Sequence, residues 1–241
     1  MVGIVPEGAP TLVVGGKRID GRAFDELRPI RMEVGVLNRA DGSAYLEWGR
    51  NKVMVGVYGP RECIPRHEAD PFRAVLHIGY SMAAFSSMEE RNRPGPNRRA
   101  REISKVMRHA FENVVLLEQF PKTAIDVRCE ILQSDGGTRC SAITATALAL
   151  ADAGIPMRDL VTSVAVGKAG GELMTDLGKE EDNFGEADMP LAFSMRTREI
   201  LLLQQDGLLT KEEIQKMIRM GFDAAAKIRK MQVEALRRKY K

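Results

Sequence analysis

The sequence predicts an α+β fold in which two similar halves, each with several strands and a helix, pack together. Runs of alternating apolar residues predict strands, and stretches with apolar residues at helical spacing predict helices. These elements are grouped rather than regularly alternating, which favours α+β over a parallel βαβ sheet. No Gly/Ser-rich linker divides the chain. We therefore expect a single domain, 1–241, with halves at roughly 21–150 and 151–241 and an extended arm at residues 1–20.

Composition excludes several classes of protein. The chain has 241 residues, enough to bury a substantial core, and no apolar run approaches the ~18 residues of a membrane span. No signal peptide is visible at the N-terminus. The three cysteines lack CxxC spacing, which favours reduced thiols in a cytoplasmic protein over a disulfide framework or a zinc site.

Arginine is the preferred basic residue. The chain has 24 arginines and 12 lysines, with a net charge of only +3. A guanidinium group can bind a phosphate through two hydrogen bonds, whereas an ammonium group acts as a point charge. The excess of arginine favours a phosphate-bearing ligand, and surface ion pairs of a thermophilic protein are the alternative.

The first half begins with strands. Three segments with period-two alternation predict an antiparallel meander: residues 30–36, 44–48 and 53–57. Gly59 and Pro60 are expected to end the third strand. A polar loop containing Arg66 follows, and residues 74–81 are expected to form a fourth strand.

A charged loop then leads into an amphipathic helix. Apolar residues recur at helical spacing from Ile103 to Leu117, and Arg98 and Arg99 stand just ahead of them. The N-terminal end of a helix disfavours cations because of the helix dipole. An anionic ligand would explain these two arginines, and a solvated loop is the equally simple alternative.

The stretch at 124–153 is the most informative part of the chain. Strict alternation predicts a strand up to residue 131, Gly136 and Gly137 turn the chain, and an Ala-rich helix follows. Thr138 and Arg139 lie at the mouth of that helix, where free N–H groups and the dipole attract an anion such as phosphate. A simple glycine turn with a Thr or Ser cap is the alternative. The stretch is not a Walker loop, because no Gly-Lys-Ser/Thr closes it.

The second half is expected to contain strands at 160–167, 172–176 and 200–204, with Asp206-Gly207 as a turn. Residues 179–190 form an acidic loop, usually a solvated hairpin tip. Asp188 adjoins an apolar run, however, and should lie at the edge of a strand. Thr210 and Glu213 form a capping box that opens a final helix reaching about residue 238.

Taken together, the motifs resemble those of the RNase PH family of phosphorolytic exoribonucleases, and within it the catalytic RNase PH-like subunits of archaeal exosomes. The resemblance rests on six segments in order: residues 18–22, 42–49, 57–62, 98–104, 135–139 and 181–190. It implies an RNase PH-type fold of two similar βα halves that assembles into rings.

The resemblance also implies the site residues. The attacking phosphate would be bound by Gly137, Thr138, Arg139 and Arg99. RNA would contact Arg66, Arg98, Arg99 and Arg139. The catalytic pair would be Asp182 and Asp188, which could hold Mg²⁺ or pass a proton to the leaving oxygen. Cys140 stands where bacterial RNase PH usually has Thr, outside the implied phosphate contacts.

The implied activity is 3′-to-5′ degradation of single-stranded RNA by phosphorolysis, with inorganic phosphate as co-substrate and nucleoside diphosphates as products. The reaction would reverse with excess diphosphate and add a tail. Two phosphoryl groups must meet in this reaction, so cations and N–H donors are required around them. A carboxylate beside phosphate needs a proton or a metal ion.

The resemblance implies particular partners as well. The catalytic subunits of the family alternate with a homologous non-catalytic subunit in a six-membered ring, and RNA-binding cap subunits are expected. Two alternatives stay open: a free-standing RNase PH-like enzyme that trims tRNA 3′ ends, and a non-catalytic ring subunit that only binds RNA. The intact Thr138–Arg139 and Asp182/Asp188 set disfavours the second alternative.

Overall fold

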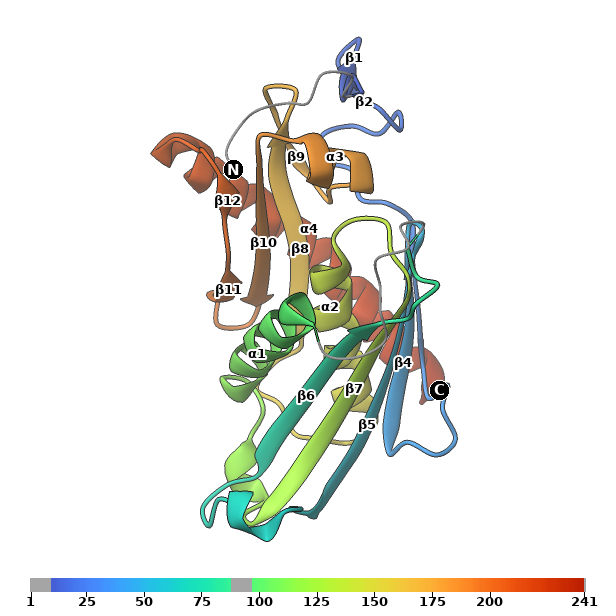
Figure 1. The fold of residues 1–241 in the computed structure, drawn as a ribbon, viewed down its shortest axis with the longest axis vertical. Helices are drawn as coiled ribbons and strands as arrows, with labels where there is room; N and C mark the ends of the chain where they lie inside the picture. Colours follow the sequence, from blue (N-terminus) through green and yellow to red (C-terminus); the bar gives the residue numbers. More distant parts are fainter. Residues whose placement is uncertain (1–9, 88–96, 241) are drawn as a thin grey trace.

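A computed structural model describes residues 10–87 and 97–240. The described residues form two large sheets, one above the other in Figure 1, and a small two-stranded sheet near the N-terminus. The first contains, in spatial order, β3 (Ile30–Val34), β4 (Gly42–Trp48), β5 (Asn51–Glu62), β7 (Thr123–Gln133) and β6 (Val75–Met82). The second contains β11 (Glu199–Leu203), β10 (Ala187–Ser194), β8 (Val161–Ala169) and β9 (Glu172–Thr175), with β12 (Asp206–Gly207) also paired to β10.

Four helices accompany the sheets: α1 (Arg98–Glu112), α2 (Thr138–Asp152), α3 (Lys179–Phe184) and α4 (Lys211–Lys239). Two short 3₁₀ helices, η1 (Arg66–Glu68) and η2 (Leu117–Gln119), lie in connections of the first half. In Figure 1, α2 lies where the two sheets meet and α4 runs behind both. The contacts agree, because α2 packs against β4, β5 and β8, and α4 packs against β3 and β8.

The predicted meander is present as β3, β4 and β5, all antiparallel. The expected end of the third strand is wrong. Gly59-Pro60 does not stop β5, which continues to Glu62 across an irregularity in its pairing with β7. A proline is tolerated at such a bulge because it has no N–H to contribute to the ladder.

One part of the first sheet is parallel. Strand β6 pairs in parallel with β7, and α1 forms the crossover between them. The sequence predicted β6 and α1, but not the parallel pairing of β6 with β7. The helix begins earlier than expected, because Asn97 caps it by accepting a hydrogen bond from the N–H of Ala100. Arg98 and Arg99 therefore occupy its first turn instead of preceding it.

The central helix α2 is almost completely enclosed. Thirteen of its 15 residues are buried, so it has no solvent face of the kind an amphipathic surface helix shows. Its composition of Ala, Leu, Ile and Thr lets strands of both sheets approach it closely. Apolar side chains from both sheets, α2 and α4 form one continuous core that includes Trp48, Leu148 and Phe193.

The second half differs from expectation in two places. Residues 179–184 are not part of a loop but form the short helix α3, and Asp206-Gly207 is not a turn but the strand β12. The predicted edge position of Asp188 is correct in that the residue lies in β10, opposite Asp206 of β12. The capping box of Thr210 and Glu213 opens α4 as predicted.

Residues 1–9 of the expected N-terminal arm lie outside the described residues. Beyond them the chain forms a small hairpin of β1 (Val13–Val14) and β2 (Lys17–Arg18). The side chain of Arg18 is fully buried, and its guanidinium group forms two hydrogen bonds with the carboxylate of Glu181 in α3. Its other donors reach the carbonyl oxygens of Thr175 and Asp176, at 2.6 and 2.8 Å.

Within residues 10–87 and 97–240, no helix combines the length and the apolar character needed to cross a membrane.

Replacing Arg18 by Met should strongly destabilise the fold. The substitution keeps the volume but removes the closest cation from the buried Glu181 carboxylate, leaving Arg22 at 3.8 Å. Breaking a buried pair in this way costs about 3 kcal/mol or more. Urea denaturation followed by circular dichroism measures the loss. Arg31→Met is the matched control, because the Arg31–Glu33 pair is exposed and should leave the free energy of unfolding nearly unchanged. Equal stability of both variants would contradict the prediction.

Candidate functional site

The glycine turn leaves the N-terminus of α2 open. Gly136 and Gly137 both have positive φ angles, 74° and 66°, and Gly137 is the N-cap residue of the helix. No side chain caps this end, so the simple alternative of a Thr or Ser cap does not apply. The first N–H groups of a helix have no partner within the helix and carry its positive dipole. The turn therefore presents uncapped donors to an anion.

Thr138 adds a hydroxyl donor at the same place. Its Oγ1 accepts a hydrogen bond of 3.0 Å from the hydroxyl of Tyr80, which comes from β6. Burial raises the pKa of Tyr80 to about 12, so the tyrosine stays protonated and keeps donating. Because the Thr138 oxygen accepts here, its own hydrogen remains available to an anion.

Two arginines face the same space from different helices. Arg139 in the first turn of α2 donates to Gln204, and its Nη2 lies 3.3 Å from Oε1 of Glu102 in α1. Gln204 also donates to Glu102, at 3.0 Å, so the three side chains form a closed set. Arg99, in the first turn of α1, lines the same cavity. An anion at the N-terminus of α2 would thus meet two guanidinium groups.

Two aspartates contribute carboxylates to the same cavity. Asp182 lies in α3 and Asp188 in β10, and both line a cavity of about 380 Å³ with the turn and the two arginines. Neither carboxylate makes a hydrogen bond or ion pair within residues 10–87 and 97–240. The cavity's polar lining consists of Arg99, Glu102, Thr138, Arg139, Asp182, Asn183, Asp188, Gln204, Gln205 and Asp206.

The electrostatics of the two aspartates follow from this arrangement. Burial raises the pKa of Asp182, although Arg99 and Arg139 oppose the change. Burial, together with the nearby charges of Asp182 and Asp206, raises the pKa of Asp188 to about 6. A carboxyl group with this pKa can release or take up a proton near neutral pH, which suits a general acid or base.

The structure brings together most of the predicted site residues. Gly137, Thr138, Arg139, Arg99, Asp182 and Asp188 all line the one cavity, whereas Arg66 and Arg98 do not. The sequence did not predict five of the polar residues that line it: Glu102, Asn183, Gln204, Gln205 and Asp206. Glu102 lies within the 98–104 motif, and Asp206 was interpreted only as turn chemistry. Gln204 carries no signal in the sequence that points to Arg139.

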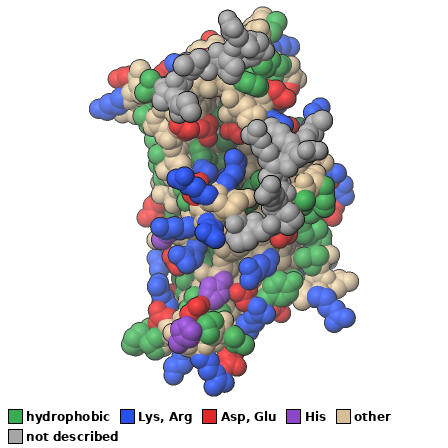
Figure 2. Space-filling model, in the orientation of Figure 1, with side chains coloured by type: hydrophobic (Ala, Val, Ile, Leu, Met, Phe, Trp, Pro, Cys, Tyr) green, Lys and Arg blue, Asp and Glu red, His purple; other side chains and the backbone are tan. Residues whose placement is uncertain are grey.

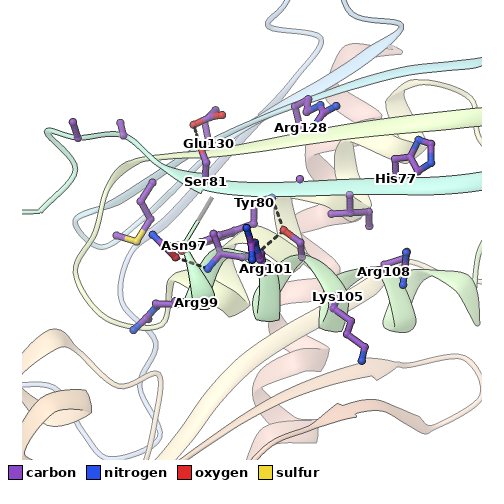
Figure 3. Close-up of a pocket in the computed structure, with 17 residues that line it drawn as sticks. His77, Tyr80, Ser81, Asn97, Arg99, Arg101, Lys105, Arg108, Arg128 and Glu130 are labelled. Carbon is purple, nitrogen blue, oxygen red and sulfur yellow. Dashed lines mark hydrogen bonds between the residues drawn. The ribbon is translucent and has the colours of Figure 1, made fainter. Parts of the chain in front are cut away.

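A second, larger hollow lies beside the first. This β6 groove, of about 800 Å³, runs along β6 between α1 and β7. Figure 3 shows Arg99 at one end and His77 and Arg108 at the other, with Arg101 and Lys105 along α1 and Arg128 across from them. Arg99 lines both hollows. The groove and the cavity therefore adjoin at Arg99.

The surface around the groove is basic. Figure 2 shows Lys and Arg side chains gathered over α1, in the middle of this face. At the far end of the groove, Nε2 of His77 lies 3.7 Å from the carboxylate of Glu68 in η1, the short helix that begins with Arg66. Arg66 is exposed and paired with Glu62 at 2.7 Å. A polyanionic chain could follow cations from η1 to Arg99.

Asp188→Asn should change the pH dependence of stability. The carboxyl's ordinary pKa is 3.8, and the folded value is about 6. Between these values the folded protein binds more protons than the unfolded chain, so the free energy of unfolding of the parent falls as pH rises from 4 to 6. The asparagine variant lacks this fall. We expect its melting temperature to exceed that of the parent at pH 8 and to match it near pH 4.

Thermal unfolding across this pH range measures the effect. Asp223→Asn, which removes an exposed carboxyl from α4, is the matched control. A difference between the Asp188→Asn variant and the parent that is the same at pH 4 and pH 8 would rule out an elevated pKa.

Comparison with known proteins places the chain in a family. Family models described as the 3′ exoribonuclease family match residues 26–156 (domain 1) and 159–224 (domain 2). The chain is 57% identical to the exosome complex component Rrp41 of Thermococcus kodakarensis, covering 98% of this chain and 94% of the relative. It is 54% identical to the Rrp41 of Thermoplasma acidophilum, covering 93% and 90%.

Two solved structures share the fold. Rice Rrp46 matches with a TM-score of 0.81 and 26% identity, covering 91% of this chain and 100% of the other. A chain of the Archaeoglobus fulgidus exosome with RNA bound to the active site matches with a TM-score of 0.76 and 25% identity, covering 93% of each. The predicted α+β fold of RNase PH type is thereby confirmed. The chain belongs to the RNase PH family of 3′ exoribonucleases.

Proposed function

We propose that this chain degrades RNA from its 3′ end by phosphorolysis, as the catalytic ring subunit of an exosome. The observation that carries the proposal is the cavity in which a helix N-terminus without a side-chain cap meets two arginines and two aspartates that have no ion-pair partner among the described residues. The identity to exosome components of archaea, over nearly the whole chain, supports the same role. Inorganic phosphate is then the co-substrate.

The anion-binding wall of the cavity suits the attacking phosphate. Phosphate would accept hydrogen bonds from the N–H groups at Gly137 and Thr138, from the Thr138 hydroxyl and from the guanidinium of Arg139. Arg99 would lie between this phosphate and the last phosphodiester of the RNA. A phosphate oxygen forms a bond to the terminal phosphorus as the bond to the preceding 3′-oxygen breaks. Cations fixed at both phosphoryl groups stabilise the charge that grows there.

The leaving 3′-oxygen takes the electron pair of the broken bond and needs a proton. Asp188, with a pKa of about 6, is the group in the cavity best matched to deliver one near neutral pH. The products are a nucleoside diphosphate and an RNA one nucleotide shorter. Excess diphosphate drives the same steps backwards and adds a tail.

The alternative role of the aspartate pair, in place of proton delivery by Asp188, is to hold Mg²⁺ as ionised carboxylates. This ion is commonly bound through one or two carboxylates together with substrate phosphates. Asp182 and Asp188 have no protein cation as an ion-pair partner among the described residues, and burial raises the pKa of both. No group of three or more His, Cys, Asp or Glu side chains suited to a metal occurs in the described part of the chain. Bound Mg²⁺, held by these two carboxylates, would offset the charge of the phosphoryl oxygens.

RNA would reach the cavity through the β6 groove. Arg66 at η1 and Arg99 at the cavity mark the two ends, and Arg101, Lys105 and Arg128 lie between them. These cations can contact phosphates but are not arranged around base edges, so the path should accept single-stranded RNA of any sequence. Arg98 starts α1 next to Arg99 and is exposed, so it can join this path at its inner end.

The partner expected in the ring is a homologous non-catalytic subunit, with RNA-binding cap subunits on the assembly. Two observations support a contact surface for another chain. Strands β6 and β11 each lie at an edge of their sheet, with no strand on the outer side among the described residues. Exposed apolar side chains lie on and beside β11, at Ile200, Leu203 and Leu208.

RNA degradation should require inorganic phosphate. Incubation of 3′-labelled RNA with the chain, alone and assembled with its ring partner, should release labelled nucleoside diphosphates in phosphate buffer. Asp188→Asn should lower turnover by about 10²-fold, the scale of a lost acid–base group, while RNA binding persists. Thin-layer chromatography distinguishes diphosphates from monophosphates.

Release of monophosphates in phosphate-free buffer would replace phosphorolysis by hydrolysis. RNA binding without any degradation, in both preparations, would favour a silent ring subunit. Equal activity with and without the partner would remove the need for a ring. A folded Asp188→Asn variant that works at the parent rate would make that carboxylate structural.

Arg66→Ala should weaken RNA binding equally for different sequences. An arginine that contacts only phosphate contributes to affinity through counterion release, so its loss lowers the slope of log Kd against log salt by about one. Fluorescence anisotropy with two unrelated single-stranded RNAs over a range of salt measures both effects. The control is Arg73→Ala, which removes a neighbouring exposed arginine paired with Asp70. An effect of the same size in both variants would make Arg66 one surface charge among others.

A further inference from the structure

We infer that Asn51 is a positioning residue for the phosphate-binding turn, a role that rests on the proposed function. Asn51 begins β5 and touches the turn through both ends of its amide. Its Nδ2 donates to the carbonyl of Gly136 at 2.6 Å. Its Oδ1 accepts from the N–H of Asp135 at 2.5 Å. The side chain thus joins two successive residues of the turn by hydrogen bonds.

Arg28 holds the neighbouring peptide in the same way. Its Nη1 donates to the carbonyl of Asp135 at 2.6 Å. In a planar trans peptide the carbonyl and the following N–H point in opposite directions. Carbonyls held toward Asn51 and Arg28 therefore turn the N–H groups of Gly136 and Gly137 away from them. The direction of these donors is fixed by the residues beneath the turn.

The two positioning side chains are themselves rigid. Asn51 is completely buried and Arg28 is 7% exposed. The guanidinium of Arg28 binds the carboxylate of Asp176 at 2.7 Å, and Nε1 of Trp48 donates to the same carboxylate at 2.9 Å. Burial alone would raise the pKa of Asp176, but Arg28 holds it below its usual value, so the pair stays charged. Preorganised donors bind an anion without the cost of ordering them on arrival.

A second contact places the turn against α3, the helix that carries Asp182. A Cβ on Gly136 would lie 2.7 Å from the backbone carbon of Gly178, the N-cap residue of α3. The turn and the helix that carries Asp182 therefore touch backbone to backbone. If the amide bridge of Asn51 is lost, this contact prevents the turn from relaxing toward α3, so any relaxation displaces the N–H donors of the turn relative to Asp182.

A positioning role and a merely structural role differ in what they change. Loss of a structural hydrogen bond lowers stability and affects all ligands alike. Loss of positioning raises the KM for phosphate and leaves the affinity for RNA unchanged, because the cations of the RNA path lie on α1, β7 and η1. The separation of these two constants is the decisive measurement.

The test uses Asn51→Leu and Asn51→Asp in the chain assembled with its ring partner. Leucine has a similar volume and no polar atoms, so the Gly136 carbonyl keeps only the longer hydrogen bond of 3.5 Å from Nη2 of Arg28, and the N–H of Asp135 loses its acceptor. Aspartate retains the acceptor for Asp135 and loses the donor to Gly136. Loss of a short, buried hydrogen bond costs enough to change an affinity by roughly tenfold. We expect the KM for inorganic phosphate to rise by at least about that factor in both variants.

The RNA dissociation constant should remain within about twofold of the parent, since no cation of the groove is altered. Asn113→Leu, at an exposed position after α1, is the matched control and should change neither constant. Circular dichroism at the assay temperature establishes folding, and Asn51→Asp serves if Asn51→Leu does not fold.

An unchanged KM for phosphate in a folded variant, or a parallel rise in the KM for phosphate and the Kd for RNA, would overturn the inference. Absence of any phosphate dependence in the parent would instead overturn the proposed function, so the two failures are distinguishable.

Discussion

The buried carboxylate of Asp176 is the interaction on which the arrangement of the site depends. Asp176 lies just after β9 with a φ of 58°, and its carboxylate accepts hydrogen bonds from Arg28 and Trp48 of the first half. The backbone carbonyl of Asp176 accepts a hydrogen bond from Arg18 of the N-terminal hairpin. One residue therefore links the second sheet, the first sheet and the hairpin. Buried ion pairs largely offset their own desolvation and add little net stability. What this set fixes is relative position, which a reaction between two bound anions requires.

The acidic residues around the site serve two separate tasks, some in buried ion pairs and others in the cavity. The Arg18–Glu181 and Arg28–Asp176 pairs are closed and buried, so they hold α3 and the glycine turn in place. Asp182 and Asp188 are left without such partners among the described residues, and burial raises the pKa of both. Glu181 and Asp182 are adjacent in sequence yet serve different tasks. A helix turns neighbours about 100° apart, so one side chain can point into the core and the next into the cavity.

Much of the fold and part of the site follow from the sequence. Alternation identified β7, the all-apolar run identified α2, and Thr210 with Glu213 marked the start of α4, because each pattern reflects local burial or capping. Helix α3 was not predicted, since five of its six residues are polar and show no apolar period, and Arg18 holds it through Glu181, 163 positions away. Asp206 and Gln204 escaped because strand pairing and a contact with Arg139 bring them to the cavity. In the sequence Asn51 is only one polar residue of a turn, because its contacts with Asp135 and Gly136 are made by the fold.

The enclosed helix α2 determines how the site can move. Local opening of a protein begins where few apolar contacts must break, and buried central elements open only with the whole molecule. The N-terminus of α2 is the floor of the site, yet the body of this helix is packed by both sheets. Its amide hydrogens should exchange with solvent among the slowest in the chain. The proposed phosphate-binding side of the site is therefore rigid. The motion that would advance the RNA by one nucleotide must then come from the nucleic acid and from the exposed side chains of the groove.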